Sequence, residues 1–145
     1  MFDLDPHSLN VLVVDDHKVI CRLLENFLRA NGFQHIDLAA DCAEAVHKME
    51  FHKYDIVFLD WNMPGKTGYS LMQEMREERE HDATAIVMVT AESEERHVVE
   101  ALKAGATAYI VKPVARETFD KNLYKIIGWL ARVRSSIHYK KGAPG

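Results

Sequence analysis

Four short apolar runs in this 145-residue chain each end beside a polar residue suited to phosphate chemistry. The runs are 11–14, 56–59, 85–89 and 108–111, and the polar residues that follow them are Asp15 with Asp16, Asp60, Thr90 and Lys112. An apolar run of this length without polar interruption is typical of a strand buried on both faces. If the four strands are parallel, these polar residues share the carboxyl edge of one sheet, where open α/β sheets place their sites.

Three of these residues are carboxylates: Asp15, Asp16 and Asp60. Carboxylates brought close together repel one another, and their charged forms are disfavoured unless a cation joins them. Mg²⁺ suits such a set because it binds through one or two carboxylates, with water and phosphate oxygens as its other ligands. Mn²⁺ is the expected substitute. The alternative is that Asp15 and Asp16 only cap the helix that follows the first strand.

Lys112 and Thr90 can complete a phosphate site beside these carboxylates. The ammonium of Lys112 can act as a point charge that pairs with Asp60 or with a phosphoryl oxygen. A cis bond between Lys112 and Pro113 would aim that ammonium back over the strand ends. The hydroxyl of Thr90 can donate to a phosphoryl oxygen. Taken alone, Lys112 could equally bury its aliphatic chain and expose its ammonium to water. Thr90 could equally be present only because threonine favours strands.

One of the three carboxylates can attack a phosphorus centre, since covalent aspartyl phosphate is an established catalytic strategy. Phosphoryl transfer asks mainly for alignment and for neutralisation of charge on the equatorial oxygens. A metal ion, a lysine and a hydroxyl supply both. Asp60 is the predicted nucleophile because it stands alone, is central in chain order and is followed by a tight turn at Pro64-Gly65.

The segments between the apolar runs have the apolar spacing of amphipathic helices. Helices are predicted around 20–28, 41–51, 68–80, 93–105 and from 116 to about 133, and a strand nearer the sheet edge is predicted at 35–39. Asn31-Gly32 is expected to end the first helix. Asp41 with Glu44 resembles a capping box for the second. Buried side chains are expected at Leu71, Met72 and Met75, at Val98, Val99 and Leu102, and at Phe119, Leu123, Ile126, Ile127, Leu130 and Val133.

The predicted order is a strand followed by a helix, repeated five times. This alternation favours an α/β fold, a parallel sheet with helices on both faces. The doubly wound order 2-1-3-4-5 uses five strands, the number found here. It places strands 1 and 3 side by side, which would bring Asp15 and Asp16 next to Asp60. We therefore predict one flavodoxin-like domain with five parallel strands and five helices.

Composition limits the classes of function that the chain can have. The net charge of −4 gives no reason to expect nucleic-acid binding by this domain. No apolar run approaches the roughly 18 residues of a membrane span, and the amino terminus has no signal-peptide pattern. Cys21 and Cys42 are the only cysteines, and we interpret both as packing thiols. The expected location is cytoplasmic.

Taken together, these residues resemble those of a known family, the CheY-like receiver domains of response regulators. The matching segments are Val11–Asp16, Leu59–Gly65, Val89–Ala91 and Lys112-Pro113. Their spacing agrees with the family, with intervals of 44, 30 and 22 residues between Asp16, Asp60, Thr90 and Lys112. The resemblance spans roughly residues 10–133. It implies a receiver domain over 8–134, with 135–145 as a tail or the start of a linker.

The resemblance also implies a role for each matching residue. Asp60 corresponds to the phosphoacceptor, and the Mg²⁺ ligands correspond to Asp16 and Asp60, with Asp15 acting through water. The remaining protein ligand corresponds to the backbone carbonyl of Asn62. Thr90 and Lys112 correspond to the pair that contacts the acyl phosphate. Tyr109 corresponds to the aromatic residue that changes rotamer with Thr90, and Asn62 and Glu92 to positions that tune dephosphorylation.

These roles predict a phosphorylation-driven switch that catalyses only its own phosphorylation and dephosphorylation. The phosphoryl donor would be a sensor histidine kinase or a histidine phosphotransfer protein. A downstream protein would read the face formed by the fourth helix, fifth strand and fifth helix. The active species is expected to be a monomer or an activation-dependent dimer.

Three alternatives compete with this prediction. The chain could be the receiver of a longer regulator with an output domain. It could be an aspartate-nucleophile phosphatase, but such enzymes usually carry a second aspartate as general acid, and here that position holds Asn62. It could carry flavin, but acidic residues follow the first strand where a phosphate would need backbone amides.

Overall fold

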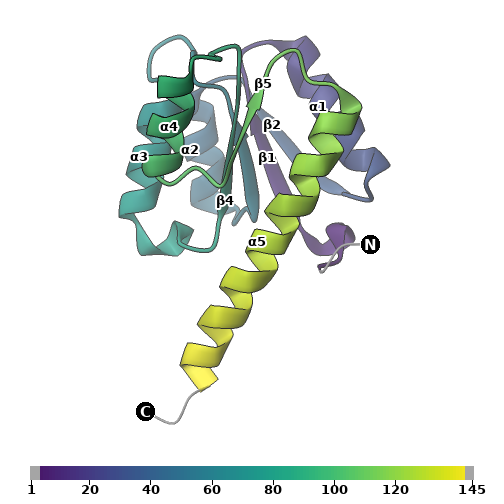
Figure 1. Cartoon of the computed structure of the whole chain (residues 1–145), viewed down its shortest axis with the longest axis vertical. Helices are drawn as coiled ribbons and strands as arrows, with labels where there is room; N and C mark the ends of the chain where they lie inside the picture. The colour runs from purple at the N-terminus through teal and green to yellow at the C-terminus, as the bar shows by residue number, and fades with distance from the viewer. Residues whose placement is uncertain (1–3, 143–145) are drawn as a thin grey trace.

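Five parallel strands form the middle layer of the chain (Figure 1). The computed structural model describes residues 4–142. The strands are β1 (Asn10–Val14), β2 (His35–Ala39), β3 (Ile56–Leu59), β4 (Ala85–Thr90) and β5 (Ala108–Val111), in the order β2-β1-β3-β4-β5. All four neighbouring pairs are parallel. This confirms the predicted α/β sheet and its strand order.

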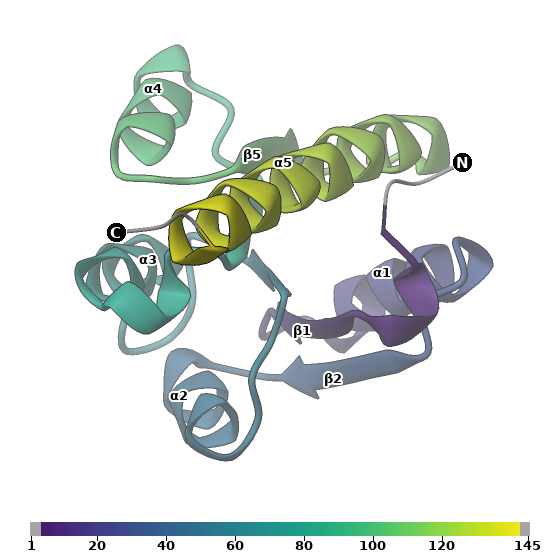
Figure 2. The same cartoon turned by 90° about the horizontal axis from the view of Figure 1, so that it is seen from below.

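Helices cover both faces of this sheet, as Figures 1 and 2 show. The helices are α1 (Lys18–Ala30), α2 (Cys42–Phe51), α3 (Gly68–Glu77), α4 (Glu95–Lys103) and α5 (Arg116–Gly142), with 3-10 turns η1 (Pro6–Ser8) and η2 (Arg79–His81). The side chains of α1 and α5 share one core cluster, and those of α2, α3 and α4 share another. The predicted three-layer arrangement is therefore confirmed, with two helices on one face and three on the other.

The alternation of side chains along β1 divides the core between these two faces. Val11 and Val13 belong to the cluster under α1 and α5, whereas Leu12 and Val14 belong to the cluster under α2, α3 and α4. Successive side chains of a strand point to opposite faces, so a strand covered on both sides must be apolar at every position. This explains why the central strands are continuous apolar runs.

Two predicted helix boundaries rest on contacts that the structure shows. The Asp41 carboxylate accepts the amide hydrogen of Glu44 at 2.8 Å, and the Glu44 carboxylate accepts that of Ala40 at 2.9 Å. The first bond satisfies a backbone donor that the first turn of α2 leaves free, and the second ties the residue before the cap to the helix. Gly32 follows α1 with φ of +93°, a left-handed conformation that costs glycine little.

The end of α3 differs from the prediction. The helix was expected to reach Glu80, but it ends at Glu77, and η2 follows. The Arg76 guanidinium donates to the carbonyl oxygens of His81 at 2.7 Å and Gly105 at 2.8 Å. Because Arg76 binds the carbonyl of His81, the chain turns back toward α3 instead of continuing the helix.

The burial predicted for α4 was wrong at two of three positions. Val99 and Leu102 are exposed at 41% and 48%, Val98 is half-buried, and the buried residue of the helix is Ala101. The helix also begins at Glu95 instead of Ser93. The small Ala101 side chain faces the sheet, and the larger apolar side chains lie at the sides of the helix. Apolar spacing alone could not distinguish these faces.

The carboxyl-terminal helix is longer than predicted. Residues from 135 onward were interpreted as a tail or linker, but α5 continues to Gly142, and its end extends beyond the rest of the domain in Figure 1. Phe119, Leu123, Ile126, Ile127 and Leu130 are buried as expected. Among the described residues, none of the helices combines the length and apolar character that crossing a membrane requires.

Candidate phosphoryl-transfer site

The sheet register brings the ends of β1 and β3 together. Val14 pairs with Leu59, and the amide of Asp60 donates to the carbonyl of Val14 at 3.1 Å. The next residues, Asp15 and Asp60, are therefore held side by side, and both are buried, at 3% and 4% exposure. Asp15 follows β1 directly and Asp60 follows β3 directly. Both carboxylates therefore lie at the carboxyl edge of the sheet.

Four residues at this edge form a possible cation site. Ligand atoms of Asp15, Asp16, His17 and Asp60 all lie within 4.8 Å of one another. Three of the four are carboxylates, the hard oxygen donors that Mg²⁺ and Mn²⁺ prefer. The donor set therefore fits the predicted metal, with Asp16 as its most exposed carboxylate. The predicted ligand role of the Asn62 carbonyl stays a prediction.

His17 was not predicted to take part in this cluster. Its amide donates to the Asp15 carboxylate at 2.9 Å, and its imidazole Nδ1 lies 3.1 Å from Asp15 and 3.2 Å from Asp16. The interpretation of Asp15 and Asp16 as caps of α1 was wrong, because the residue at the capping position is His17, whose side chain makes no capping bond. The two aspartates are thus available to a cation.

Lys112 contacts both buried carboxylates. The bond between Lys112 and Pro113 is cis, the arrangement that the sequence left open. The Nζ of Lys112 lies 2.7 Å from the Oδ2 of Asp15 and 3.2 Å from the Oδ2 of Asp60. Burial by itself would lower the pKa of Lys112, but the two carboxylates outweigh it and raise that pKa above its usual value. These two contacts hold the ammonium beside Asp60, where it can meet a phosphoryl oxygen.

The environment of Asp60 disfavours the ionised form of its carboxyl group. Burial raises the pKa of the Asp60 carboxyl, and the nearby Asp15 carboxylate adds to the rise. Lys112 and a hydrogen bond from Thr90 act in the opposite direction. A second cation at this site would favour the ionised carboxylate, which is the nucleophilic form.

Thr90 and Tyr109 are connected through the backbone of one loop. Thr90 is fully buried, and its hydroxyl accepts the amide hydrogen of Glu92 at 3.3 Å. The Tyr109 hydroxyl donates to the carbonyl of Glu92 at 2.5 Å. A shift of Thr90 toward Asp60 would therefore disturb the loop that holds the Tyr109 ring.

A polar network beside the site includes a residue that the sequence did not single out. The Asn62 amide donates to the Glu92 carboxylate at 2.6 Å, and the other carboxylate oxygen lies 3.5 Å from His97 Nδ1. The His97 ring also meets the Trp61 ring edge-on, with centroids 5.1 Å apart. His97 is remote from Asn62 in the sequence, so no local pattern could have joined them.

The loop after Asp60 passes very close to α3. The amide of Gly68 donates to the carbonyl of Trp61 at 2.9 Å, and a Cβ at Gly68 would lie 1.8 Å from the carbonyl oxygen of Asp60. Only a residue without a side chain fits there. Gly68 is therefore part of the support that fixes the backbone of Asp60.

Comparison with known proteins agrees with this arrangement. A family model described as the response regulator receiver domain matches residues 11–124. The chemotaxis protein CheY-3 of Vibrio cholerae is 35% identical over 119 residues, which cover 82% of this chain and 92% of that protein. The chemotaxis protein CheY of Pseudomonas aeruginosa is 33% identical over 118 residues, which cover 81% and 95%.

Solved structures show the same similarity. The structure of Vibrio cholerae CheY4 has a TM-score of 0.74 and 32% identity, covering 81% of this chain and 98% of that one. A two-component response regulator from Clostridium difficile has a TM-score of 0.75 and 30% identity, covering 83% and 97%. The sheet order, the convergent strand ends and these matches lead to one conclusion: the chain belongs to the response regulator receiver domain family.

Proposed function

We propose that this receiver domain accepts a phosphoryl group on Asp60 from a phosphohistidine, in a reaction that requires Mg²⁺. The donor is a sensor histidine kinase or a histidine phosphotransfer protein. The observation that carries the proposal is the position of the Asp60 carboxylate, between the acidic pair Asp15 and Asp16 and the ammonium of Lys112. The location that follows from such a partner is the cytoplasm, in keeping with two free thiols.

The transfer is an in-line displacement at phosphorus. A carboxylate oxygen of Asp60 forms the new O–P bond while the P–N bond of the phosphohistidine breaks, and the imidazole nitrogen leaves with the electron pair. Lys112 neutralises charge on one phosphoryl oxygen, and the Thr90 hydroxyl donates to another. Mg²⁺, when bound by Asp15, Asp16, Asp60 and the Asn62 carbonyl, supplies a positive charge that offsets the carboxylates and the phosphoryl oxygens.

Phosphorylation then changes a surface formed by α4, β5 and α5. The new charge draws Thr90 and Lys112 inward, and Tyr109 turns into the space that Thr90 leaves. Exposed apolar side chains on these three elements support a partner-binding role: Val99, Leu102, Val111 and Tyr124. A downstream protein, or a second receiver on activation, would bind this surface.

The decisive experiment uses the small donor acetyl phosphate. We expect acid-precipitated protein to carry one acyl phosphate per chain with Mg²⁺, and none after Asp60→Asn. The exposed Asp82→Asn is the matched control and should behave like the parent. Acyl phosphate on Asp60→Asn at the parental rate would overturn the proposal.

Trp61 offers a second measurement because it follows Asp60 directly. In a Trp129→Phe background it is the only tryptophan, so its fluorescence should respond to Mg²⁺ with beryllofluoride. Removing Mg²⁺ with EDTA should reverse that response, and a signal unchanged by either treatment would contradict the site.

The chain acts as a switch, and the rival function is a phosphatase for external substrates. Asn62, two residues after Asp60, has an amide that cannot act as a general acid, which favours the switch. Steady-state hydrolysis of phosphate esters distinguishes the two, since turnover beyond one phosphate per chain would establish the phosphatase.

A further inference from the structure

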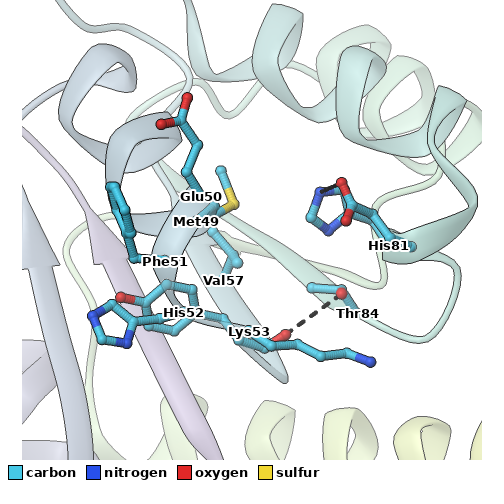
Figure 3. Close-up of a pocket in the computed structure, with 10 residues that line it drawn as sticks. Met49, Glu50, Phe51, His52, Lys53, Val57, His81 and Thr84 are labelled. Carbon is cyan, nitrogen blue, oxygen red and sulfur yellow. Dashed lines mark hydrogen bonds and ion pairs between the residues drawn. The ribbon is translucent and has the colours of Figure 1, made fainter.

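A groove lies at the edge of the sheet opposite Asp60, between α2 and the segment formed by α3 and η2. It consists of two adjoining cavities of about 260 and 310 Å³. They share Met49, Glu50, Glu80 and His81 among their lining residues. In Figure 3, Met49 and Glu50 project from α2 on one side, and His81 faces them across the open space. We call this feature the α2–η2 groove.

Apolar side chains at the groove are unusually exposed. Phe51, at the end of α2, is 70% exposed, and Val46, five residues earlier in the same helix, is 37% exposed. The Phe51 ring touches the His47 ring, with centroids 5.2 Å apart. Met75 also lines the groove. A single exposed apolar residue is ordinary, but two on one helix beside a concave surface are what a partner buries, and aromatic anchors often dominate such interfaces.

The charges that surround these apolar side chains are mostly negative. Four glutamates line the two cavities, Glu50, Glu74, Glu78 and Glu80, and Lys53 is the only lysine or arginine among the lining residues. Glu74 already pairs with Lys66, so Glu50, Glu78 and Glu80 are the glutamates that carry the argument. A hydrogen bond between the carboxyl groups of Glu78 and Glu80 raises the pKa of Glu78. His81 is 3.7 Å from both. Crowded carboxylates of this kind are stabilised by an additional cation.

We propose that the α2–η2 groove binds a basic amphipathic helix of a partner protein. Apolar side chains of that helix would pack on Val46, Met49 and Phe51, and its lysines or arginines would pair with the glutamates. Nucleic acid and other polyanions are excluded as occupants by the acidic lining. A second copy of this chain is disfavoured because each copy carries a net charge of −4.

This surface is separate from the phosphorylation switch. The lining residues include neither Asp60, Thr90, Tyr109 nor Lys112, and the groove lies where Tyr54 and Thr84 precede β3 and β4. Binding should therefore persist in both states of the receiver. The affinity with Mg²⁺ and beryllofluoride is expected to equal that without them, so the outcome does not depend on phosphorylation at Asp60.

The test uses the full ¹⁵N-labelled chain and a helical peptide, about 18 residues long, of leucine and lysine with one apolar face. We expect saturable chemical-shift changes concentrated at residues 46–54 and 78–84. The matched peptide with glutamate in place of lysine should cause none. Changes spread over the whole surface, or concentrated on α4, β5 and α5, would contradict the proposal.

Variants make the test specific to the groove. The double change Glu78→Lys with Glu80→Lys should raise the Kd of the lysine peptide at least tenfold. Its control, Glu95→Lys with Glu100→Lys on α4, changes the net charge equally and should move the Kd less than threefold. Equal effects of the two double variants would mean that only net charge matters and would overturn the proposal.

Phe51 provides an independent, uncharged test. Phe51→Ser should raise the Kd at least fivefold, whereas Val19→Ser, at a residue on α1 that is 79% exposed, should leave it unchanged. Circular dichroism must show equal melting temperatures for both variants. Sedimentation without peptide distinguishes self-association: a dimer of the parent that Phe51→Ser dissociates would place a second copy in the groove and contradict the proposal.

Discussion

Lys112 lies closer to Asp15 than to Asp60, with its Nζ 2.7 Å from one carboxylate and 3.2 Å from the other. Both carboxylates are almost fully buried, and the Lys112 side chain is 14% exposed. One side chain that follows β5 thus neutralises residues that follow β1 and β3. These ion pairs therefore hold the ends of β1, β3 and β5 together at the carboxyl edge of the sheet.

Lys112→Met should therefore destabilise the fold. Removing one partner of a buried ion pair leaves an uncompensated charge, which costs about 3–5 kcal/mol. We expect a loss of about 3 kcal/mol in the free energy of unfolding at pH 7, measured by urea denaturation. The exposed Lys121→Met is the control and should change it by less than about 0.5 kcal/mol.

The pH dependence of that loss follows from Asp60, whose pKa is raised in the folded protein. A carboxyl with a raised pKa contributes stability that is fully present below its ordinary value of about 3.9 and is lost as pH rises through the folded value. Lys112 lowers the pKa of Asp60, so removing Lys112 should raise that pKa further. The difference in unfolding free energy between Lys112→Met and the parent should grow between about pH 4 and 7, and a constant difference would contradict this reasoning.

Gly68→Ala should displace Asp60, although Gly68 is not itself one of the polar residues of the site. The added Cβ would lie 1.8 Å from the Asp60 carbonyl oxygen, so the backbone of Asp60 must shift. We expect a loss of about 1–3 kcal/mol in stability and at least a tenfold slower reaction with acetyl phosphate.

Gly65→Ala is the matched comparison for this effect. Gly65 has φ of +80°, but a Cβ added there would have no atom within 4 Å, so its change costs about 1–2 kcal/mol of backbone strain without moving Asp60. Its rate of phosphorylation should stay within threefold of the parent. Equal rates for the two variants would show that the contact at Gly68 does not position Asp60.

His97→Leu should lengthen the lifetime of the acyl phosphate by about threefold. His97 contacts the Glu92 carboxylate, which holds the Asn62 amide, and an amide held in one orientation can order the attacking water. Glu92→Ala should have a larger effect in the same direction, and His47→Leu, which contacts Phe51, should have none. The measurement is loss of radioactive phosphate after removal of the donor, and an unchanged lifetime in both test variants would exclude this network from the reaction.

Both cysteines should react slowly with thiol reagents in the folded protein. Burial raises the pKa of Cys42 to about 11 and also raises that of Cys21, and the thiolate is the reactive form. At about pH 8 we expect both thiols to be modified at least a hundredfold more slowly than in urea, by a colorimetric disulfide reagent. The two residues belong to different core clusters, so no internal disulfide should form on oxidation.

Much of this fold could be predicted because a strand that is buried on both faces has a recognisable sequence. A strand between two helical layers must be apolar at every position, so β1, β3 and β4 were evident, and Asp15, Asp60 and Thr90 stood out where those runs stop. Capping at Asp41 and the turn at Gly32 were also local and could be predicted. Each of these features depends on residues that are neighbours in the chain.

Other features depend on how separate elements pack, and the sequence does not record them. The spacing in α4 suggested burial of Val99 and Leu102, but only the packed structure shows that Ala101 meets the sheet. The bonds from Arg76 to the turn after α3 decided where that helix ends.

The order of strands and helices, and the residue types at the carboxyl edge of the sheet, could be read from hydrophobic periodicity, because that periodicity follows from which residues each element buries. Three pairings emerge only from the folded chain: Lys112 lies nearest Asp15, His97 reaches Glu92, and Phe51 borders an acidic groove. Those pairings depend on distances between side chains far apart in the chain, and such distances exist only once the layers have packed.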